Sequence, residues 1–562
     1  MRSASKEPEI EAGMSRISNG SGKVKTDIDE KELEGVLERI AKSILRCEVK
    51  TRSELQNRKM KEVKASDLDF IPSNSLILDY IRRSYPDVLE RVTPILVKKP
   101  SRTLSGVAVV SVMTSPHSCP HGRCVFCPGG EQEEIPTPQS YTGKEPAAMR
   151  GAQHGFDPFK QVKARVGQLS RIGHTTDKVD MIIMGGTMPA RDPHYQENFV
   201  KGCFDGLNGS ISGSLIEAQQ RNETAVHRCI GLTYETRPDW CGENEIDTML
   251  RLSVTRVELG VQTVFDEPLR KSCRGHTVKD SIESTRLLKD AGLKVNYHIM
   301  PGIPGSTREM DLESARRIFE QEEFKPDMIK IYPTLVIAGT ELYDRFRSGE
   351  YTPLSTQDAA ELVADIKELT PPWVRIQRVQ RDIPSPLVEG GVKNSNLRQL
   401  ANEILTRRGR SCRCIRCREI GHKLRSDDEP PGEENIEIVR REYDASQGRE
   451  IFLSFEETDR DILVGFLRLR IPSGSTHRSE ETEKSAMVRE LKVFGSMVPL
   501  GESSGDKWQH RGFGGRLLAE GERIAKDEMG RDRILITSGV GVREYYRKSG
   551  YSLNGPYMEK CL

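Results

Sequence analysis

The sequence lacks long hydrophobic runs and contains few aromatic residues. No run approaches the roughly 18 consecutive apolar residues that a membrane helix requires, and residues 1–26 have no apolar core of the kind found in signal peptides. Hydrophobic residues make up 36% of the chain and aromatic residues 6%. These features predict a soluble protein with no membrane partner. Residues 1–26, rich in Ser, Gly, Glu and Lys, are expected to form a disordered tail.

Net charge is also nearly absent, because 85 Lys and Arg residues balance 84 Asp and Glu residues. The basic residues are nevertheless concentrated in residues 42–64 and 404–425, which contain few acids. Solvated helix faces often carry such charge, but two basic segments flanking a catalytic domain favour a polyanionic partner. With 562 residues the chain is too long for one ordinary core, so we expect three or four domains.

Cysteine is sparse outside two tight groups, which contain six of the twelve cysteines. This distribution favours metal binding in a reducing compartment, the cytoplasm, over a disulfide framework. The first group is Cys119, Cys124 and Cys127, spaced C-x4-C-x2-C. A closed zinc site needs a fourth ligand, whereas three cysteines leave one iron of a 4Fe-4S cluster open to another molecule. The alternative is a zinc knuckle completed by His117 or His121.

The cysteine loop resembles that of radical S-adenosylmethionine (SAM) enzymes, because an apolar run precedes it and Phe126 stands just before the last thiol. From residue 106 to about 382, short β-branched runs alternate with longer amphipathic segments. This alternation predicts an α/β fold with a parallel sheet, a partial (β/α) barrel within residues 96–400. Functional residues are then expected at the C-terminal ends of the strands. The seven predicted strands are 107–113, 181–184, 230–234, 256–261, 295–300, 328–332 and 374–379.

Polar and glycine residues follow several of these strands. Gly185 and Gly186 come after the second strand, where radical SAM enzymes place a Gly-Gly turn that receives the amino group of SAM. Glu258 and Gln262, on the fourth strand, are similar to positions that contact the SAM ribose and carboxylate. The alternatives are a plain loop for the glycines and, for the two polar residues, satisfaction of buried backbone inside the barrel.

The second cysteine group comprises Cys412, Cys414, Cys417 and His422. Three thiolates and one imidazole form a closed tetrahedral set, which suits structural zinc. A basic loop with free thiols is the alternative. We expect residues 401–435 to be a zinc-binding linker that fixes the edge of the barrel to the next domain.

The sequence pattern changes in residues 436–562, where strand-like pairs lead into a glycine-rich turn and a helix. Gln509, Gly512, Phe513, Gly514 and Gly515 form a turn that resembles the pyrophosphate loop of GNAT acetyltransferases, in which backbone N–H groups and the helix dipole meet the phosphates of acetyl-CoA. The preceding strand, Glu490, Leu491, Lys492 and Val493, is expected to run beside the pantetheine. Tyr546, and as an alternative Tyr545, is placed where GNAT enzymes carry a hydroxyl near the thioester sulfur.

Residues 27–95 are expected to be helical, with basic faces that favour nucleic acid. A plain helical cap on the barrel is an equally good interpretation. The helix predicted within 27–47 has apolar residues at helical spacing.

Taken together, the motifs resemble the catalytic subunit of Elongator over about residues 75–562. The cysteine loop is shorter than the eukaryotic one, and the 412–422 group is similar to the zinc site of archaeal and bacterial members, which suggests a single-subunit form. The segments that carry the resemblance include Cys124-Val-Phe-Cys127-Pro-Gly-Gly, Met184-Gly-Gly-Thr, Glu258-Leu-Gly-Val-Gln, Tyr332-Pro-Thr-Leu-Val and Tyr545-Tyr-Arg-Lys-Ser-Gly-Tyr.

The resemblance implies an enzyme that modifies carbon 5 of the tRNA wobble uridine to a carboxymethyl group, with a 4Fe-4S cluster, SAM, acetyl-CoA and zinc. A radical from SAM would take a hydrogen from the acetyl methyl group, and the resulting carbon radical would add to the base. The resemblance also assigns acetyl-CoA contact to Lys178, to residues 490–493 and 513–515, and to Tyr546. The implied partners are the tRNA anticodon loop and either further copies of the chain or Elongator-like subunits. The alternatives are a protein lysine acetyltransferase with a structural cluster and a non-catalytic RNA-binding scaffold.

Overall fold

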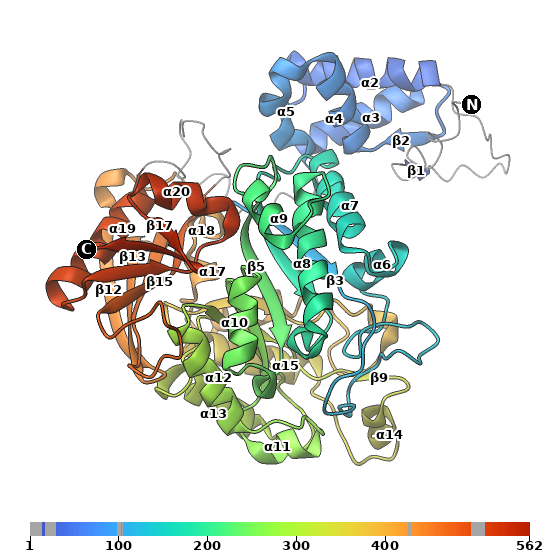
Figure 1. The fold of residues 1–562 in the computed structure, drawn as a ribbon. Coiled ribbons are helices and arrows are strands. Elements are labelled where there is room, and N and C mark those ends of the chain that lie inside the picture. The colour runs from blue at the N-terminus through green and yellow to red at the C-terminus, as the bar shows by residue number, and fades with distance from the viewer. Residues whose placement is uncertain (1–13, 17–29, 98–102, 104, 425–428, 496–511) are drawn as a thin grey trace. The chain divides into compact units, whose positions relative to one another are not determined.

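A computed structural model describes residues 14–16, 30–97, 103, 105–424, 429–495 and 512–562, and its chain divides into two compact units (Figure 1). The first unit comprises Met1–Thr103 and Ala164–Thr176, and the second comprises Leu104–Lys163 and Asp177–Leu562. None of the described helices combines the length and the apolar character needed to cross a bilayer.

The first unit is a small helical assembly. Its elements are β1 (Met14–Arg16), α2 (Glu30–Leu45), α3 (Arg52–Lys64), β2 (Phe70–Pro72), α4 (Asn74–Ser84), η1 (Pro86–Val88), α5 (Leu89–Leu96) and the end of α7 (Pro158–Arg171). Apolar residues at helical spacing on α2 form its buried face, as predicted. A capping box of Thr51 and Glu54 starts α3. Within the predicted tail, β1 pairs antiparallel with β2.

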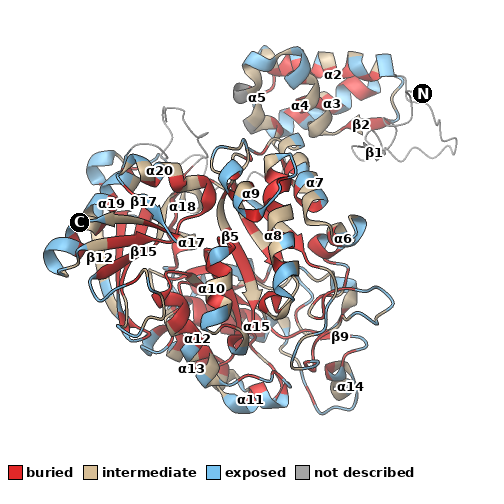
Figure 2. Cartoon of the chain, in the orientation of Figure 1, coloured by how far each residue is buried: buried red, intermediate tan, exposed pale blue. Residues whose placement is uncertain are grey.

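The second unit contains a curled sheet of seven parallel strands in the order β10-β8-β7-β6-β5-β4-β3. All seven predicted strands are present, which confirms the barrel. Every residue of β6 is buried, as expected of a central strand covered on both faces. Figure 2 shows buried residues along the strands and exposed residues on the outer sides of the helices. The strands are β3 (Ala108–Met113), β4 (Lys178–Met184), β5 (Arg228–Thr236), β6 (Arg256–Gln262), β7 (Lys294–Ile299), β8 (Met328–Ile331) and β10 (Arg375–Val379).

Helices follow most of these strands and cover the sheet. A two-stranded pair, β9 (Val336–Ile337) and β11 (Val388–Gly390), lies outside it. The helices are α6 (Pro146–Gln153), α7, α8 (Pro193–Asn208), α9 (Leu215–Asn222), α10 (Glu243–Arg251), α11 (Asp266–Lys271), α12 (Val278–Asp290), α13 (Arg308–Glu320), α14 (Glu341–Arg347) and α15 (Thr356–Leu369), with short 3-10 helices η3 (Met188–Ala190), η4 (Pro238–Trp240) and η5 (Ser385–Leu387).

The C-terminal part of the second unit is another seven-stranded sheet, in the order β12-β13-β14-β15-β16-β18-β17. All neighbours are antiparallel except β15 and β16. The last hairpin, β17–β18, was not predicted from the sequence. The elements are η6 (Glu433–Asn435), β12 (Glu437–Ala445), β13 (Gly448–Glu457), β14 (Ile462–Ile471), β15 (Ser485–Val493), α19 (Phe513–Arg523), η7 (Ile524–Glu528, a π-helical turn), β16 (Arg533–Ile536), η8 (Val540–Val542), α20 (Arg543–Lys548), β17 (Ser552–Asn554) and β18 (Tyr557–Cys561).

A segment of three short helices joins the barrel to the C-terminal sheet: α16 (Leu397–Arg407), α17 (Ile415–Arg418) and α18 (Ile420–Lys423). The Glu419 carboxylate accepts a hydrogen bond from Arg375 at the start of β10 at 2.7 Å. The backbone of Glu419 forms a bridge to Leu463 of β14. One residue of the linker therefore contacts both sheets.

Buried charges hold the C-terminal sheet against the N-terminal ends of the barrel strands. Arg489 of β15 donates to both oxygens of Asp327 at 2.7 and 2.6 Å and to Glu450 at 2.8 Å. Arg470 of β14 donates to Asp290 at 2.6 Å and to Glu450 at 3.0 Å. Asp327 precedes β8 and Asp290 ends the helix before β7. The cysteine loop, which follows β3, lies at the opposite ends of these parallel strands.

Candidate active site

The first three cysteines lie on the loop that follows β3. Cys124 and Cys127 are buried and Cys119 is half-buried. Among the described residues, the sulfur atoms of these three do not form a group within 4.8 Å of one another, whereas those of the second cysteine group do. The second group is thus the more compact of the two.

A cation and an imidazole accompany these thiols. Arg274 Nη1 lies 3.4 Å from Cys124 Sγ, and His121 Nε2 lies 3.1 Å from the same atom. The hydrogen bond between Cys127 and Cys124 lowers the pKa of Cys124 and raises that of Cys127, and Arg274 and His121 add to the first effect. Burial raises the pKa of Cys119. Cys124 is thus the thiol most strongly favoured as a thiolate.

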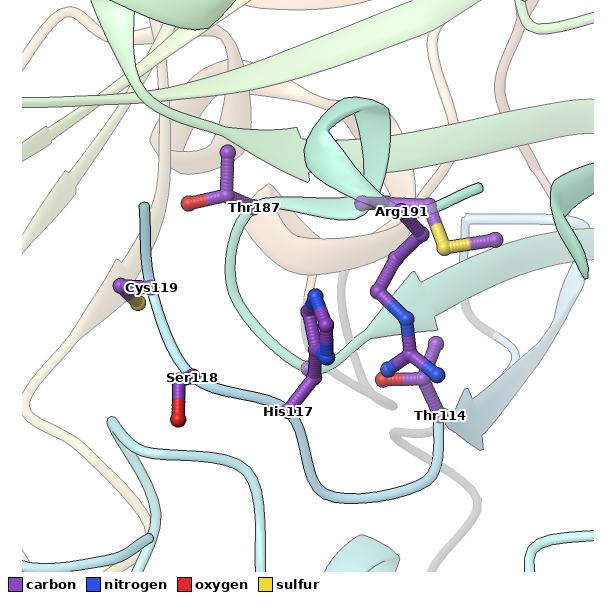
Figure 3. A pocket seen from close by; sticks show the side chains of 8 residues that line it. Thr114, His117, Ser118, Cys119, Thr187 and Arg191 are labelled. Carbon is purple, nitrogen blue, oxygen red and sulfur yellow. The ribbon is translucent and has the colours of Figure 1, made fainter. Parts of the chain in front are cut away.

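The Gly-Gly turn after β4 adjoins the cysteine loop. Gly185 and Gly186 have φ of 141° and 93°, which favours glycine. A Cβ on Gly185 would lie 1.9 Å from Thr114 Oγ1, so no other residue fits there without rearrangement. This turn and the cysteine loop line one pocket, in which His117 and Arg191 lie on one side and Cys119 on the other (Figure 3). Gly185 of the turn and Cys119 of the loop therefore line the same pocket.

The two polar residues of β6 differ in their surroundings. Glu258 Oε2 accepts from His298 Nε2 at 2.8 Å and from Lys330, and its Oε1 accepts from Asn296 at 3.3 Å. Burial opposes ionisation, but the Lys330 ammonium and His298 outweigh it and hold the pKa of Glu258 well below its usual range. Gln262 is buried with φ of 67°, and its Oε1 has no hydrogen-bond partner among the described residues. Strained backbone and an unsatisfied oxygen are typical of a ligand-binding position.

Glu235, at the end of β5, connects this network to the Gly-Gly turn. Its Oε2 accepts from Tyr141 at 2.8 Å and from the Gly185 N–H at 3.3 Å. Potential ligand atoms of Glu235, Glu258 and His298 lie within 4.8 Å of one another. Because Lys330 already neutralises Glu258, the structure assigns no metal to these three side chains.

The second cysteine group lies in the linker. The sulfur atoms of Cys412, Cys414 and Cys417 lie within 4.8 Å of one another, which fits a single tetrahedral metal ion. Buried Lys367 approaches Cys417 Sγ at 3.7 Å. The structure does not bring His422 into this group: its Nε2 lies 3.0 Å from Glu419 Oε1.

The predicted pyrophosphate turn is only partly described, because Gln509 lies outside the described residues. Gly512 has φ of 82° and immediately precedes α19. Among the described residues, none has an atom within 4 Å of a Cβ placed on Gly512 or Gly515. β16 pairs with β15 only from Ser485 to Val488, whereas residues 490–493 pair with β14. The two parallel strands thus part beside the first turn of α19.

The two tyrosines of α20 lie in different environments. A Cβ on Gly514 would lie 3.0 Å from the Tyr545 hydroxyl and 3.8 Å from Val493, so this hydroxyl and the end of β15 both adjoin the first turn of α19. Tyr545 is exposed, whereas Tyr546 is buried in the core of the sheet beside Phe513 and Tyr551. Burial raises the pKa of both phenols. Tyr545 is therefore the better placed of the two.

The remaining predicted residues flank this region or face the barrel. Glu490 forms an ion pair with Arg468 at 3.1 Å, and Leu491 packs against the core of the sheet. Burial lowers the pKa of Lys492 and that of Lys178, which begins β4. On β15, the backbone is thus a better candidate for contact with a ligand than the Glu490 side chain.

The cationic side chains of the site were not predicted from the sequence. Arg274 reaches Cys124 across 150 residues of sequence, and Lys330 lies opposite Glu258 on a different strand. A sequence signal was available only for the charges between the two sheets, where Arg468 and Arg470 alternate with leucines in a strand that is otherwise apolar. Charged residues within apolar strands often mark buried ion pairs.

Comparisons with known proteins agree with this geometry. Residues 113–318 match the radical SAM superfamily and residues 326–407 match the Radical_SAM C-terminal domain. The fold and the cysteine loop therefore define a radical SAM protein. Such a domain implies a 4Fe-4S cluster and SAM, and three thiols with a buried guanidinium fit an anionic cluster.

Relatives that match most of the chain identify its family within the radical SAM superfamily. The chain is 54% identical over 493 residues to the tRNA uridine(34) acetyltransferase of Methanocaldococcus jannaschii (87% of this chain, 90% of that protein). It is 46% identical over 497 residues to human Elongator complex protein 3 (86% and 90%). A solved structure of an N-terminally truncated Elp3 from Methanocaldococcus infernus matches with a TM-score of 0.73 and 48% identity (82% of this chain, 100% of that chain). The chain belongs to the family of tRNA uridine(34) acetyltransferases that includes Elongator complex protein 3, which confirms the resemblance.

Proposed function

We propose that the chain modifies carbon 5 of the wobble uridine in tRNA, using SAM and acetyl-CoA to form a carboxymethyl group. The observation that carries this proposal is the pocket shared by the cysteine loop and the Gly185-Gly186 turn, in a chain 54% identical to a tRNA uridine(34) acetyltransferase. Carbon 5 of uracil is neither acidic nor nucleophilic enough for ordinary acyl transfer. A radical site in the same chain as a thioester-binding domain answers that difficulty.

The barrel residues have distinct proposed roles. Cys119, Cys124 and Cys127 hold the cluster, and the Gly185-Gly186 turn and Gln262 bind SAM. When bound, cluster and SAM together supply a carbon-centred radical that abstracts hydrogen. Glu258 acts mainly as the anionic centre of the barrel network rather than as a direct SAM contact, because three side chains already occupy its oxygens.

The C-terminal sheet is, in this proposal, a GNAT domain that holds acetyl-CoA. The phosphates would meet the backbone N–H groups at the start of α19, and the pantetheine would enter where β15 and β16 part. Three neighbouring features support this proposal: the N-terminus of α19, the point where β15 and β16 part, and the Tyr545 hydroxyl. Tyr545 would then position or protonate the thioester sulfur, and Lys178 would contact the cofactor.

Zinc and tRNA complete the proposal. Cys412, Cys414 and Cys417 would hold zinc, with His422 or another donor as fourth ligand after a change of rotamer. The exposed arginines 407, 408 and 410 would contact the tRNA backbone, whereas Arg418 is buried in ion pairs with Glu456 and Asp461. These cofactors suit a reducing cytoplasm, and the chain would act alone, as a homo-oligomer or with Elongator-like subunits.

The experiment is anaerobic incubation with tRNA, SAM, acetyl-CoA and dithionite, followed by mass spectrometry of the nucleosides. We expect 5-carboxymethyluridine only when all components are present, none with Cys127→Ser, and normal product with Cys203→Ser, a buried thiol on α8. Product formed without SAM would contradict the radical step. Acetylated lysine peptides without a modified nucleoside would instead support a protein acetyltransferase.

A further inference from the structure

The loop that carries Arg274 is packed directly against the cysteine loop. The Val125 N–H donates to the Ser272 carbonyl at 3.3 Å, which ties the two loops together. Gly275 has φ of 71°, and a Cβ there would lie 2.8 Å from the His121 Cβ, so only glycine allows this approach. The position of Arg274 beside the thiols is therefore fixed by backbone contacts on both sides.

Arg274 is a buried cation without a carboxylate partner. The residue is 8% exposed, and its guanidinium contacts the Gly260 carbonyl at 2.9 Å and Cys124 Sγ at 3.4 Å. Its Nε has no hydrogen-bond partner, and no described carboxylate forms an ion pair with it. An unpaired charge at this depth is strongly unfavourable, so its counter-charge must come from the Cys124 thiolate and any group that this thiolate holds.

A second buried arginine lies beside the same loop. Arg237, 4% exposed, follows β5 and uses its Nε and Nη2 on Asp239, while its buried Nη1 has no partner. Its Nη2 lies 3.1 Å from a Cβ placed on Gly275. Two buried guanidinium groups thus lie beside the cysteine loop, and one of them has only a thiol sulfur and a carbonyl as partners.

We propose that Arg274 is the resident counter-charge of the cluster and sets its reduction potential through the contact with Cys124. This inference rests on the cluster proposed above. Reduction adds one electron, and hence one negative charge, to a cluster that already bears thiolates. A fixed cation at the sulfur stabilises the reduced form more than the oxidised form, and hydrogen bonds to cluster sulfurs act in the same direction. Arg274 is thus a positioning and tuning residue that does not itself touch the reacting atoms.

The test is a redox titration of the reconstituted full chain without SAM, with dithionite as reductant, mediator dyes, and electron paramagnetic resonance as readout. In Arg274→Gln the ratio of reduced to oxidised cluster at a fixed potential should fall at least about tenfold, a shift of about 59 mV to more negative potential for one electron. Arg274→Lys, which keeps the charge, should stay closer to the wild type. The matched control is Arg270→Gln, an exposed arginine on α11 that should leave the potential unchanged.

The outcomes separate this inference from the proposed function. A wild-type chain that binds no cluster would contradict the proposed function. A loaded Arg274→Gln chain with the wild-type potential would overturn the tuning role alone. If Arg274→Gln folds, as judged by circular dichroism, but retains no iron, retention by Arg274→Lys supports the charge argument and loss of iron in both variants overturns it.

Discussion

Replacing Asp327 with Asn should loosen the C-terminal sheet from the barrel. The Asp327 side chain is fully buried, and its oxygens accept from Arg489 at 2.6 and 2.7 Å and from the Val295 N–H at 2.9 Å, with Arg468 at 3.6 Å. Removing one partner of a buried ion pair costs about 3–5 kcal/mol, because the other charge is left unpaired. In Asp327→Asn, Arg489 still pairs with Glu450 and Arg468 still pairs with Glu490. We therefore expect a loss of about 3 kcal/mol in unfolding free energy, the lower end of that range.

Trp373 allows this effect to be measured at the contact itself. Its ring stacks on Tyr443 of β12 at 4.5 Å, and its carbonyl accepts from Arg468 at 2.7 Å. The chain has two other tryptophans, Trp240 and Trp508, and replacing both with Phe leaves Trp373 as the single reporter. Urea unfolding followed by its fluorescence then gives the stability of the contact between the sheets.

The matched control is Asp365→Asn on α15. Asp365 also accepts from two arginines, Arg308 at 2.5 Å and Arg408 at 2.6 Å, but these pairs are partly exposed. Exposed pairs contribute about 0–1 kcal/mol each. If the two substitutions lower the unfolding free energy equally, or if Asp327→Asn lowers it by less than about 1 kcal/mol, the buried ion pairs of Asp327 do not hold the sheets together.

The pH dependence of the Asp327 effect has a definite sign. Burial opposes ionisation, but Arg489 and Arg468 hold the folded-state pKa of Asp327 well below its usual range. Its stabilising contribution is therefore fully present above the unfolded-state pKa, about 3.9, and is lost as pH falls through the folded-state pKa. The difference between wild type and Asp327→Asn should stay constant from pH 6 to 8.

Three further predictions concern other sites. Burial raises the pKa of Glu481 to about 7. The wild type should therefore lose about 3 kcal/mol of unfolding free energy between pH 4.5 and 7.5, whereas Glu481→Gln should not. Equal losses for the two proteins in urea titrations would contradict this prediction. Cys414→Ser should lose bound zinc, measured by mass spectrometry of metals, whereas Cys203→Ser should keep it; unchanged zinc in Cys414→Ser would exclude that site. Tyr545→Phe should slow tRNA-dependent acetyl-CoA turnover roughly tenfold or more, with little effect of Tyr546→Phe, and the reverse order would show that the buried phenol acts.

The barrel could be predicted because its signal is local. Each strand is a short β-branched run, and the regular alternation with helices leaves a parallel sheet as the natural arrangement. The cysteine spacing and the position of Gly185-Gly186 after the second strand are likewise properties of neighbouring residues. Short elements without a clear pattern, such as β17 and β18, escaped prediction because strand pairing rather than local propensity stabilises them: β18 pairs with β16, and β17 pairs with β18.

Contacts between distant segments could not be predicted. Nothing in the residues around Arg274 indicates that it reaches Cys124, because the packing of two loops determines that contact. In the same way, Arg468 and Arg470 signal an internal charge, but one acidic partner of each, Asp327 or Asp290, lies on the barrel. The position of the C-terminal sheet at the N-terminal ends of the barrel strands, away from the cysteine loop, also depends on these pairs.

The proposed radical chemistry depends most directly on the metal that Cys119, Cys124 and Cys127 hold. The decisive measurement is iron and sulfide analysis of the anaerobically purified chain, with electron paramagnetic resonance of the reduced protein before and after addition of SAM. We predict one 4Fe-4S cluster per chain, lost in Cys124→Ser and retained in Cys414→Ser, with a signal that changes when SAM binds the open iron. Zinc at these thiols without iron or sulfide, or a cluster whose signal ignores SAM, would contradict the account.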